Sequence, residues 1–451
     1  MTTHIRSSHA RLLLALAPIA ALALCAGRAR GQQPTAPAGD FRPIGLDEAV
    51  SLAQRNAPTA VQARGTIRTA NSAVRSAKGA LLPSLSLSVG QTQQSGDRLG
   101  QSGDIVPYTG QPWTYSTGLN LNLNLFDGGR RWSELARTRA DVGTAEANEI
   151  TQRYNLALQV KTQYFNVLAA RESEAAARSR LEQAEQQLKV ASARVRAGAA
   201  TMSDSLRSVI QMGDAQLALL TAQNAVRVGS ASLTRLVGTN DLVTADPADT
   251  LARITPLPDS AQLAAWAAEG PAVQSAQAAE RSAFAARRTA RAAYLPSVDL
   301  SFRRNGNGYD NLYGLGNKSF PYANSIGINM SYPLFNNFTR EDQQVRAAVQ
   351  VENSAAQLRD ARLLAQQNII QQLGSLQTAE QRIRIQQASV TAAQEDLRVQ
   401  QQRYTLGAST LLDLLTSQTA LNAARQALIE ARRDYRIARA QLEAVIGRDL
   451  P

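Results

Sequence analysis

The sequence predicts a mainly helical protein with long coiled α-helical hairpins, which also carries a small membrane β-sheet. Three observations predict this fold class: an internal duplication, two heptad-patterned segments of unusual length, and short strands in which leucine alternates with asparagine. Of the 451 residues 44% are hydrophobic but only 5% are aromatic. Such a composition suits close-packed, alanine-rich helices better than a bulky globular core.

The first element is a predicted secretory signal at residues 1–31. Arg6 and Arg11 lie in its basic start, and an apolar run extends from Leu12 to Ala26. A small residue, an arginine and a second small residue at Ala29–Gly31 then form a cleavage site. We therefore expect the mature chain to begin after this site and to be exported.

The few cysteine and histidine residues restrict the possible chemistry. Cys25 is the only cysteine, and its place in the signal allows either removal with the signal or lipidation. His4 and His9 are the only histidines and also lie in the signal. A mature chain without histidine has no Ser-His-Asp triad and no Cys/His zinc site. We expect no cofactor, no metal and no enzymatic activity, because the acids that a carboxylate mechanism would need are scattered along helix faces.

The net charge of +12 includes four signal arginines. The remaining basic residues are dispersed rather than clustered, and an exported chain seldom meets nucleic acid. We therefore expect no nucleic-acid partner.

The rest of the chain contains an internal duplication. "KGALLPSLSLSVG" at Lys78 matches "RAAYLPSVDLSFR" at Arg291, and "LNLFDGGRR" at Leu123 matches "YPLFNNFTR" at Tyr332. The offset changes from 213 to 209 residues between these two matches, which marks the intervening segment as a loop. Farther on, Gly198 still matches Gly407 at the offset of 209. Duplication at a fixed period indicates one structural unit repeated.

Each repeat has the same order of elements: a helix, two strands joined by a Gly-rich loop, a very long helix, a glycine break and a last helix. Pro83 and Pro296 end the first helices, because proline cannot continue a helical hydrogen-bond ladder. The predicted organisation is a signal peptide (1–31), an N-terminal extended segment (32–43), a first repeat (44–239), a linker (240–257), a second repeat (258–447) and a C-terminal tail (448–451).

The long helices are predicted at Arg131 to Ala197 and at Arg340 to Leu406, each 67 residues and therefore about 100 Å long. Apolar anchors recur every seven residues, which indicates helices that wind around one another. In the second repeat the anchors are Ile369, Leu376, Ile383, Val390, Leu397 and Tyr404, followed in the last helix by Leu414, Leu421, Leu428, Tyr435 and Leu442. A soluble coiled-coil rod would explain this helical part equally well.

The strands are the only candidates for membrane contact, since no mature segment has 18 consecutive apolar residues. In "GLNLNLNLFDGG" leucines fall on one face and asparagines on the other. The predicted lipid-facing residues are Leu119, Leu121, Leu123, Leu125, Ile326, Ile328 and Met330. Aromatic residues near the strand ends would form girdles; they are Trp113, Tyr115, Phe126, Tyr322 and Phe335. A half-buried soluble sheet would alternate in the same way.

Four strands leave two unpaired edges, which membrane hydrocarbon does not tolerate. Closure of the sheet therefore requires several chains. Three chains would supply twelve strands, an even number within the range of outer-membrane barrels.

The repeated motifs resemble those of the TolC-like outer-membrane factors, the outer membrane efflux proteins of tripartite efflux pumps and type I secretion systems. The resemblance rests on "LLPSLSLSVG", "LNLFDGGRR", "YPLFNNF" and "RYTLGASTLLDLL", in this duplicated order. It implies a homotrimer with a 12-stranded β-barrel in outer-membrane lipid, above a long periplasmic tunnel. The chain would be a passive exit duct that meets a periplasmic adaptor protein and an inner-membrane transporter. The alternatives are a periplasmic adaptor and a structural coiled-coil protein of the cell envelope.

The resemblance also assigns functional positions. It implies an adaptor-contact tip at Arg194, Val195, Gly198, Arg403, Tyr404, Leu406 and Gly407. Asp413 and its repeat partner Asp204 would line a periplasmic gate at the tunnel mouth. A second acid found three residues farther on in some family members is replaced by Thr416, which leaves a double acidic ring unsupported. A surface acid at a helix N-terminus is the other reading of Asp413.

Overall fold

The computed structural model divides the chain into two units, residues 1–40 and 41–451. It describes residues 41–93, 96–99, 103–107, 113–251, 258–316 and 320–450. The predictions for the signal peptide, Cys25 and most of the N-terminal extended segment fall outside these residues. Within them, no helix combines the length and the apolar character needed to cross a membrane.

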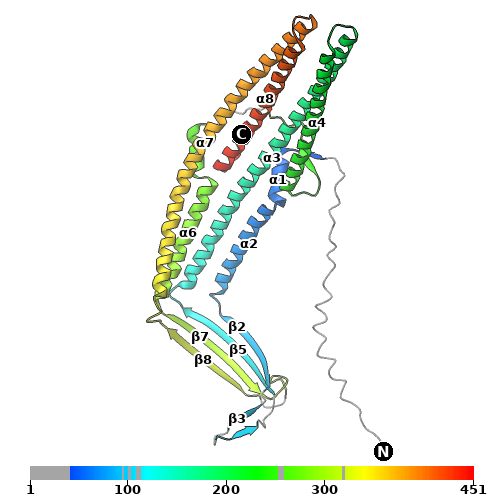
Figure 1. Cartoon of the computed structure of the whole chain (residues 1–451). Helices are drawn as coiled ribbons and strands as arrows, with labels where there is room; N and C mark the ends of the chain where they lie inside the picture. Colours follow the sequence, from blue (N-terminus) through cyan, green and yellow to red (C-terminus); the bar gives the residue numbers. More distant parts are fainter. Residues whose placement is uncertain are drawn as a thin grey trace, which may run out of the picture. The chain divides into compact units, whose positions relative to one another are not determined.

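The helices of the second unit follow the repeated order (Figure 1). The first repeat contains α1 (Leu46–Asn56), α2 (Pro58–Gly79), α3 (Arg130–Arg196) and α4 (Met202–Val237). The second contains α5 (Ser260–Ala268), α6 (Pro271–Arg291), a 3-10 turn (Ala292–Tyr294), α7 (Thr339–Thr405) and α8 (Leu411–Ile446). Helices α3 and α7 have 67 residues each. The predicted length is therefore confirmed, with each helix beginning one residue earlier than expected.

The heptad anchors form the core of the second hairpin. Four α7 anchors and five α8 anchors are at least nine-tenths buried: Ile369, Leu376, Ile383, Leu397, Leu414, Leu421, Leu428, Tyr435 and Leu442. In α3 the corresponding Val160 and Val167 are fully buried. The predicted seven-residue anchors of these helices are therefore core residues.

Glycine turns connect the helices of each hairpin. Gly198 has φ of 70° and Gly407 has φ of 77°, a left-handed conformation that side chains with a Cβ rarely adopt. The N–H of Ala199 donates to the carbonyl of Arg194, and that of Ala408 to the carbonyl of Arg403, both at 2.8 Å. These bonds satisfy carbonyls at the ends of α3 and α7, so the predicted glycine breaks between the paired helices are confirmed.

A four-stranded antiparallel sheet joins the other ends of the helices. It consists of β2 (Ser84–Gln93), β5 (Trp113–Phe126), β7 (Ser297–Gly308) and β8 (Tyr322–Ser331), in the order β2-β5-β7-β8. The pairing of β5 with β7 connects the two repeats. Among the described strands, β2 and β8 each have one edge without a partner.

Two small sheets were not predicted. β3 (Asp97–Leu99) pairs with β4 (Ile105–Pro107), and β1 (Arg42–Ile44) runs parallel to β6 (Val243–Ala245). β6 lies inside the segment predicted as a linker and is fully buried. This part of the linker is therefore a core element rather than a simple connection.

The phenol of Tyr164 attaches this small sheet to α3. Its hydroxyl lies 3.0 Å from the carbonyl oxygen of Ile44, contacts the Asp249 carboxylate and accepts from the Asp246 N–H. Burial, followed by the hydrogen bond to Asp249, raises the pKa of Tyr164, so the phenol stays neutral and holds these contacts.

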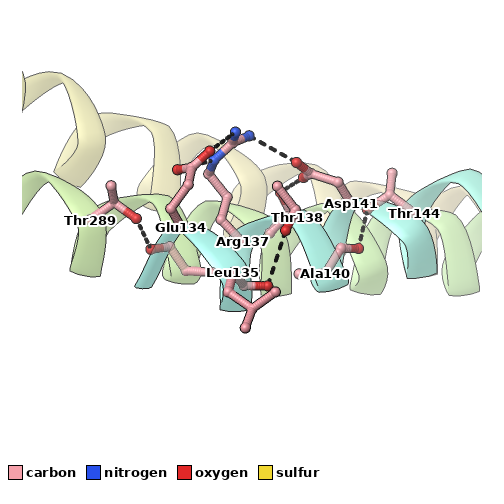
Figure 2. A network of polar contacts seen from close by, with 10 residues as sticks. Glu134, Leu135, Arg137, Thr138, Ala140, Asp141, Thr144 and Thr289 are labelled. Carbon is pink, nitrogen blue, oxygen red and sulfur yellow. Dashed lines mark hydrogen bonds and ion pairs between the residues drawn. The ribbon is translucent and has the colours of Figure 1, made fainter. Parts of the chain in front are cut away.

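A polar network connects α3 to α6 of the second repeat (Figure 2). Arg137 donates to Glu134 at 2.5 Å and to Asp141 at 2.8 Å, and Ser282 of α6 donates to Asp141. The hydrogen bond from Arg137 lowers the pKa of Glu134. The Glu134 carboxylate thus stays charged where the two repeats pack together.

Candidate functional site

One face of the four-stranded sheet is apolar along three consecutive rows. Cross-strand pairing places the predicted leucines of β5 beside the predicted isoleucines and methionine of β8, with β7 between them. The rows are Leu85–Leu121–Phe302–Ile326, Leu123–Leu300–Ile328 and Phe126–Val298–Met330. Ile326 is 75% exposed and Met330 70%, so this chain alone leaves the face largely uncovered.

Leu125 does not follow the expected alternation. A β-bulge between Asn124 and Phe126 shifts the register, so Phe126 rather than Leu125 is paired with Val298. A bulge sets two residues of one strand opposite one residue of the other. The strict alternation of the leucines therefore ends at Leu123.

The opposite face of the sheet is mostly polar. Asn120 and Asn122 of β5 pair with Arg303 and Ser301 of β7. The Asn124 amide donates to the Asp299 carboxylate at 2.7 Å. A face of hydroxyl, amide and charged groups opposite an apolar face is the arrangement of a wall between lipid and water.

The ends of the two hairpins contact each other through predicted tip residues. The Arg194 guanidinium lies 4.8 Å from the centre of the Tyr404 ring and donates to the Tyr404 carbonyl at 3.3 Å. Leu406 at the second turn is 83% exposed. Gly198, Gly407 and Arg403 are also exposed, while Val195 is half-buried. The structure thus joins Arg194 to Tyr404 and leaves an exposed surface around them.

Asp413 and Asp204, the predicted gate acids, belong to capping boxes. The Asp413 carboxylate accepts from the Thr410 N–H at 3.0 Å and from the Thr410 hydroxyl at 2.7 Å. Asp204 does the same with Thr201 at 3.1 and 2.9 Å. The side-chain hydrogen bond from Thr410 lowers the pKa of Asp413. Each acid therefore stabilises the start of its own helix.

Sequence reasoning missed Arg303 and Arg304, although "FRRNGNG" visibly interrupts the alternation of β7. It also missed Asp310, whose carboxylate accepts the N–H groups of Leu312, Gly314 and Gly316 and so shapes the loop after β7. In the described part of the chain, no three His, Cys, Asp or Glu side chains gather into a possible metal site.

Comparison with known proteins gives one consistent result. The model of the family described as outer membrane efflux protein matches residues 49–239 and 264–448. Protein CyaE of Bordetella pertussis is 29% identical over 409 residues, covering 86% of this chain and 81% of that protein. The pyoverdine export outer membrane protein OpmQ of Pseudomonas aeruginosa is 27% identical, covering 90% and 85%. The Campylobacter jejuni CmeC outer membrane channel has the same fold, with a TM-score of 0.76, 18% identity and coverage of 89% and 85%.

Proposed function

The chain belongs to the outer membrane efflux protein family, and from this premise we propose that three copies close their sheets into one 12-stranded barrel above a shared helical tunnel. It is an outer-membrane exit duct with a long periplasmic helical portion. Members of the family are trimeric channels, not enzymes, and work with adaptor proteins and inner-membrane transporters. In this chain the duct would conduct substrates passively, and an inner-membrane transporter would supply the energy.

The observation that carries the proposal is a two-faced sheet in which β2 and β8 each have one edge that no other described strand covers. Its apolar rows suit lipid, and its polar face suits a water-filled lumen. Unpaired backbone groups at a sheet edge cost several kcal/mol each in hydrocarbon. A second copy that supplies the missing strand would remove this cost at both edges.

The duplication tells which strand a second copy supplies. Within the chain, β5 of the first repeat pairs with β7 of the second. The repeat equivalents of β5 and β7 are β8 and β2, so β8 should pair with β2 of the next copy. The pair Asn122 and Ser301 becomes, at offsets of 209 and 213, Ser331 opposite Ser88 of the neighbour.

The helices support the same assembly. α8 packs on α3 within the chain, where Ile429 is 8% exposed in a core that includes Phe165 and Leu168. The repeat equivalent of Ile429 is Leu220 on α4, which is 61% exposed. Since α7 is the repeat equivalent of α3, Leu220 should pack on α7 of a second copy.

At the far ends of the hairpins we place the adaptor contact. Leu406, Gly198, Gly407 and Arg403 provide an exposed surface, and Arg194 and Tyr404 hold the two turns together. Asp413 and Asp204 begin the following helices. In a trimer, three copies of Asp413 near one axis would repel one another and attract cations.

A disulfide between neighbouring edge strands tests the assembly and its register. In the double variant Ser331→Cys, Ser88→Cys, oxidation of the detergent-extracted protein should yield covalent trimers on a denaturing gel. The Cβ atoms of two directly opposed residues on paired strands lie about 4.5–5.5 Å apart, whereas residues offset by two positions lie about 7–8 Å apart. The matched control Ser331→Cys, Ser86→Cys should therefore cross-link poorly.

The possible outcomes distinguish a wrong strand register from a wrong assembly. Stronger cross-linking in the Ser86→Cys control would overturn the register but keep the assembly. A protein that remains monomeric in detergent and gives no covalent product with either pair would refute the assembly itself.

A further inference from the structure

Arg304 occupies the lipid-facing side of the sheet, and we propose that its guanidinium binds a phosphate headgroup of an outer-leaflet membrane lipid. This inference rests on the proposed function, because it requires the apolar face to contact the membrane. It assigns a lipid site to a residue that lies outside the apolar rows and outside the predicted lumen.

The register fixes the face on which Arg304 lies. Arg304 pairs with Leu119 on one side and with Asn324 on the other. It is two residues beyond Phe302, whose partners are Leu121 and Ile326. Because side chains two apart on a strand share a face, Arg304 continues the apolar face by one row.

The position along the strand places Arg304 at the border of the apolar rows. These rows end on β7 at Phe302, and the next residues beyond Arg304 on the same face are Gly306 and Gly308. Gly306 pairs with Tyr322 and Gly308 with Tyr115, and tyrosine is enriched at the level of the lipid headgroups. The Arg304 side chain therefore lies between the apolar rows and this aromatic level.

Aromatic side chains hold the guanidinium in place. Its central carbon lies 4.7 Å from the centre of the Tyr322 ring. Gly306 permits this arrangement, since a Cβ there would meet Phe320 and Tyr322 atoms at 2.6 and 2.7 Å. Phe320 and Tyr322 are 5.4 Å apart, as are Tyr115 and Tyr313 at the same end of the sheet. The girdle predicted at Tyr115 and Tyr322 thus includes an arginine.

The charge of Arg304 has no carboxylate partner among the described residues, since none of their ion pairs includes it. Its neighbours on the apolar face are Leu119, Asn324 and the Tyr322 ring, and none of them is anionic. Guanidinium binds phosphate through paired, charge-assisted hydrogen bonds. At a membrane border the available anion is a lipid phosphate, and the aromatic ring beside it fits the same interfacial level.

Arg303 provides a matched control within the same strand. It is adjacent in sequence, carries the same charge and is also exposed, but it pairs with Asn120 and Ser325 on the polar face. The two arginines therefore differ in the face they occupy. A lipid should distinguish them, whereas a small anion in solution should not.

The test measures lipid retained by the purified full-length trimer. Native mass spectrometry would count molecules of diphosphorylated lipid A bound to wild type, Arg304→Gln, Arg304→Lys and Arg303→Gln. We expect Arg304→Gln to weaken binding about five- to tenfold, because a charge-assisted phosphate contact is lost. Arg304→Lys should keep part of the affinity, and Arg303→Gln should bind as wild type does.

Two results would overturn the inference. They are equal losses in Arg303→Gln and Arg304→Gln, and equal binding of lipid A from which the phosphates have been removed. Each protein is also tested for trimer formation and for conductance in planar bilayers. If wild type forms conducting trimers but lipid binding does not depend on Arg304, this inference fails alone. If wild type forms none, the proposed function fails.

Discussion

The two helical hairpins of this chain have helices of the same lengths, but they differ in which apolar side chains are buried and which are exposed. Both α3 and α7 have 67 residues, and both α4 and α8 have 36. In α8, Leu414 and Leu421 are buried in a cluster with Leu397 and Leu411 near the turn. In α4, the corresponding positions are Ser205 and Met212, both half-buried.

On its outer surface, α4 exposes apolar side chains at positions where α8 buries them fully or in part. Leu206, Leu220 and Val228 are 58%, 61% and 59% exposed. Their equivalents in α8 pack against the chain's own clusters, fully or in part; they are Leu415, Ile429 and Ile437. These three α8 positions are therefore covered from within the chain, whereas the matching α4 positions form an apolar stripe suited to a neighbouring copy.

We expect the largest effect, loss of the trimer, when a charged residue replaces an apolar one on this stripe. Leu220→Lys should abolish the trimer while leaving the monomer folded, because each interface loses about 1.5–3 kcal/mol of apolar burial and gains an unpaired charge. Size-exclusion chromatography with light scattering of the detergent-extracted protein measures the change. Gln216→Lys is the control, since Gln216 is exposed on the same helix and its repeat partner is Arg425. A trimeric Leu220→Lys protein would contradict the assigned interface.

A smaller effect should distinguish the two hairpin cores. Leu421→Ala removes a side chain that is 3% exposed and should cost about 2–4 kcal/mol of unfolding free energy. The matched Met212→Ala, at a half-buried position, should cost about 1 kcal/mol. Thermal unfolding followed by circular dichroism would compare them. Equal losses would show that the first hairpin is packed as tightly as the second.

The same comparison explains what could be predicted from the sequence. Heptad anchors such as Leu376 and Leu442 are buried as expected, because a seven-residue period leaves a helix few other ways to cover its apolar stripe. The strand pairs followed from alternation and from the duplication. The adaptor-contact role of the residues around Tyr404 came only from the resemblance, since exposed turns carry no periodic signal.

Other features could not be predicted from local patterns. The pairing of Arg42–Ile44 with Val243–Ala245 joins two three-residue strands far apart in sequence, too short to show a period. The bulge at Leu125 depends on the partner strand, and a sequence of alternating leucines gives no sign of it. The capping boxes were visible as Thr410 and Asp413 at the right spacing, but the resemblance directed attention to a gate.

We expect the smallest effects from variants that distinguish a helix-capping role of Asp413 from a gating role. Its pKa is lowered from the ordinary 3.8, so its contribution to stability is complete above that value and is lost only as pH falls through the lower, folded-state pKa. Asp413→Asn keeps an acceptor for the Thr410 N–H but removes the charge. Thr410→Ala keeps the charge but weakens the cap, at a cost of about 1 kcal/mol. If three copies of Asp413 restrict the tunnel mouth, Asp413→Asn should weaken divalent-cation block in planar bilayers and lower thermal stability only slightly. Thr410→Ala should lower thermal stability more and leave the block unchanged. Unchanged block in Asp413→Asn would leave Asp413 with the capping role that it already shares with Asp204 in the first hairpin.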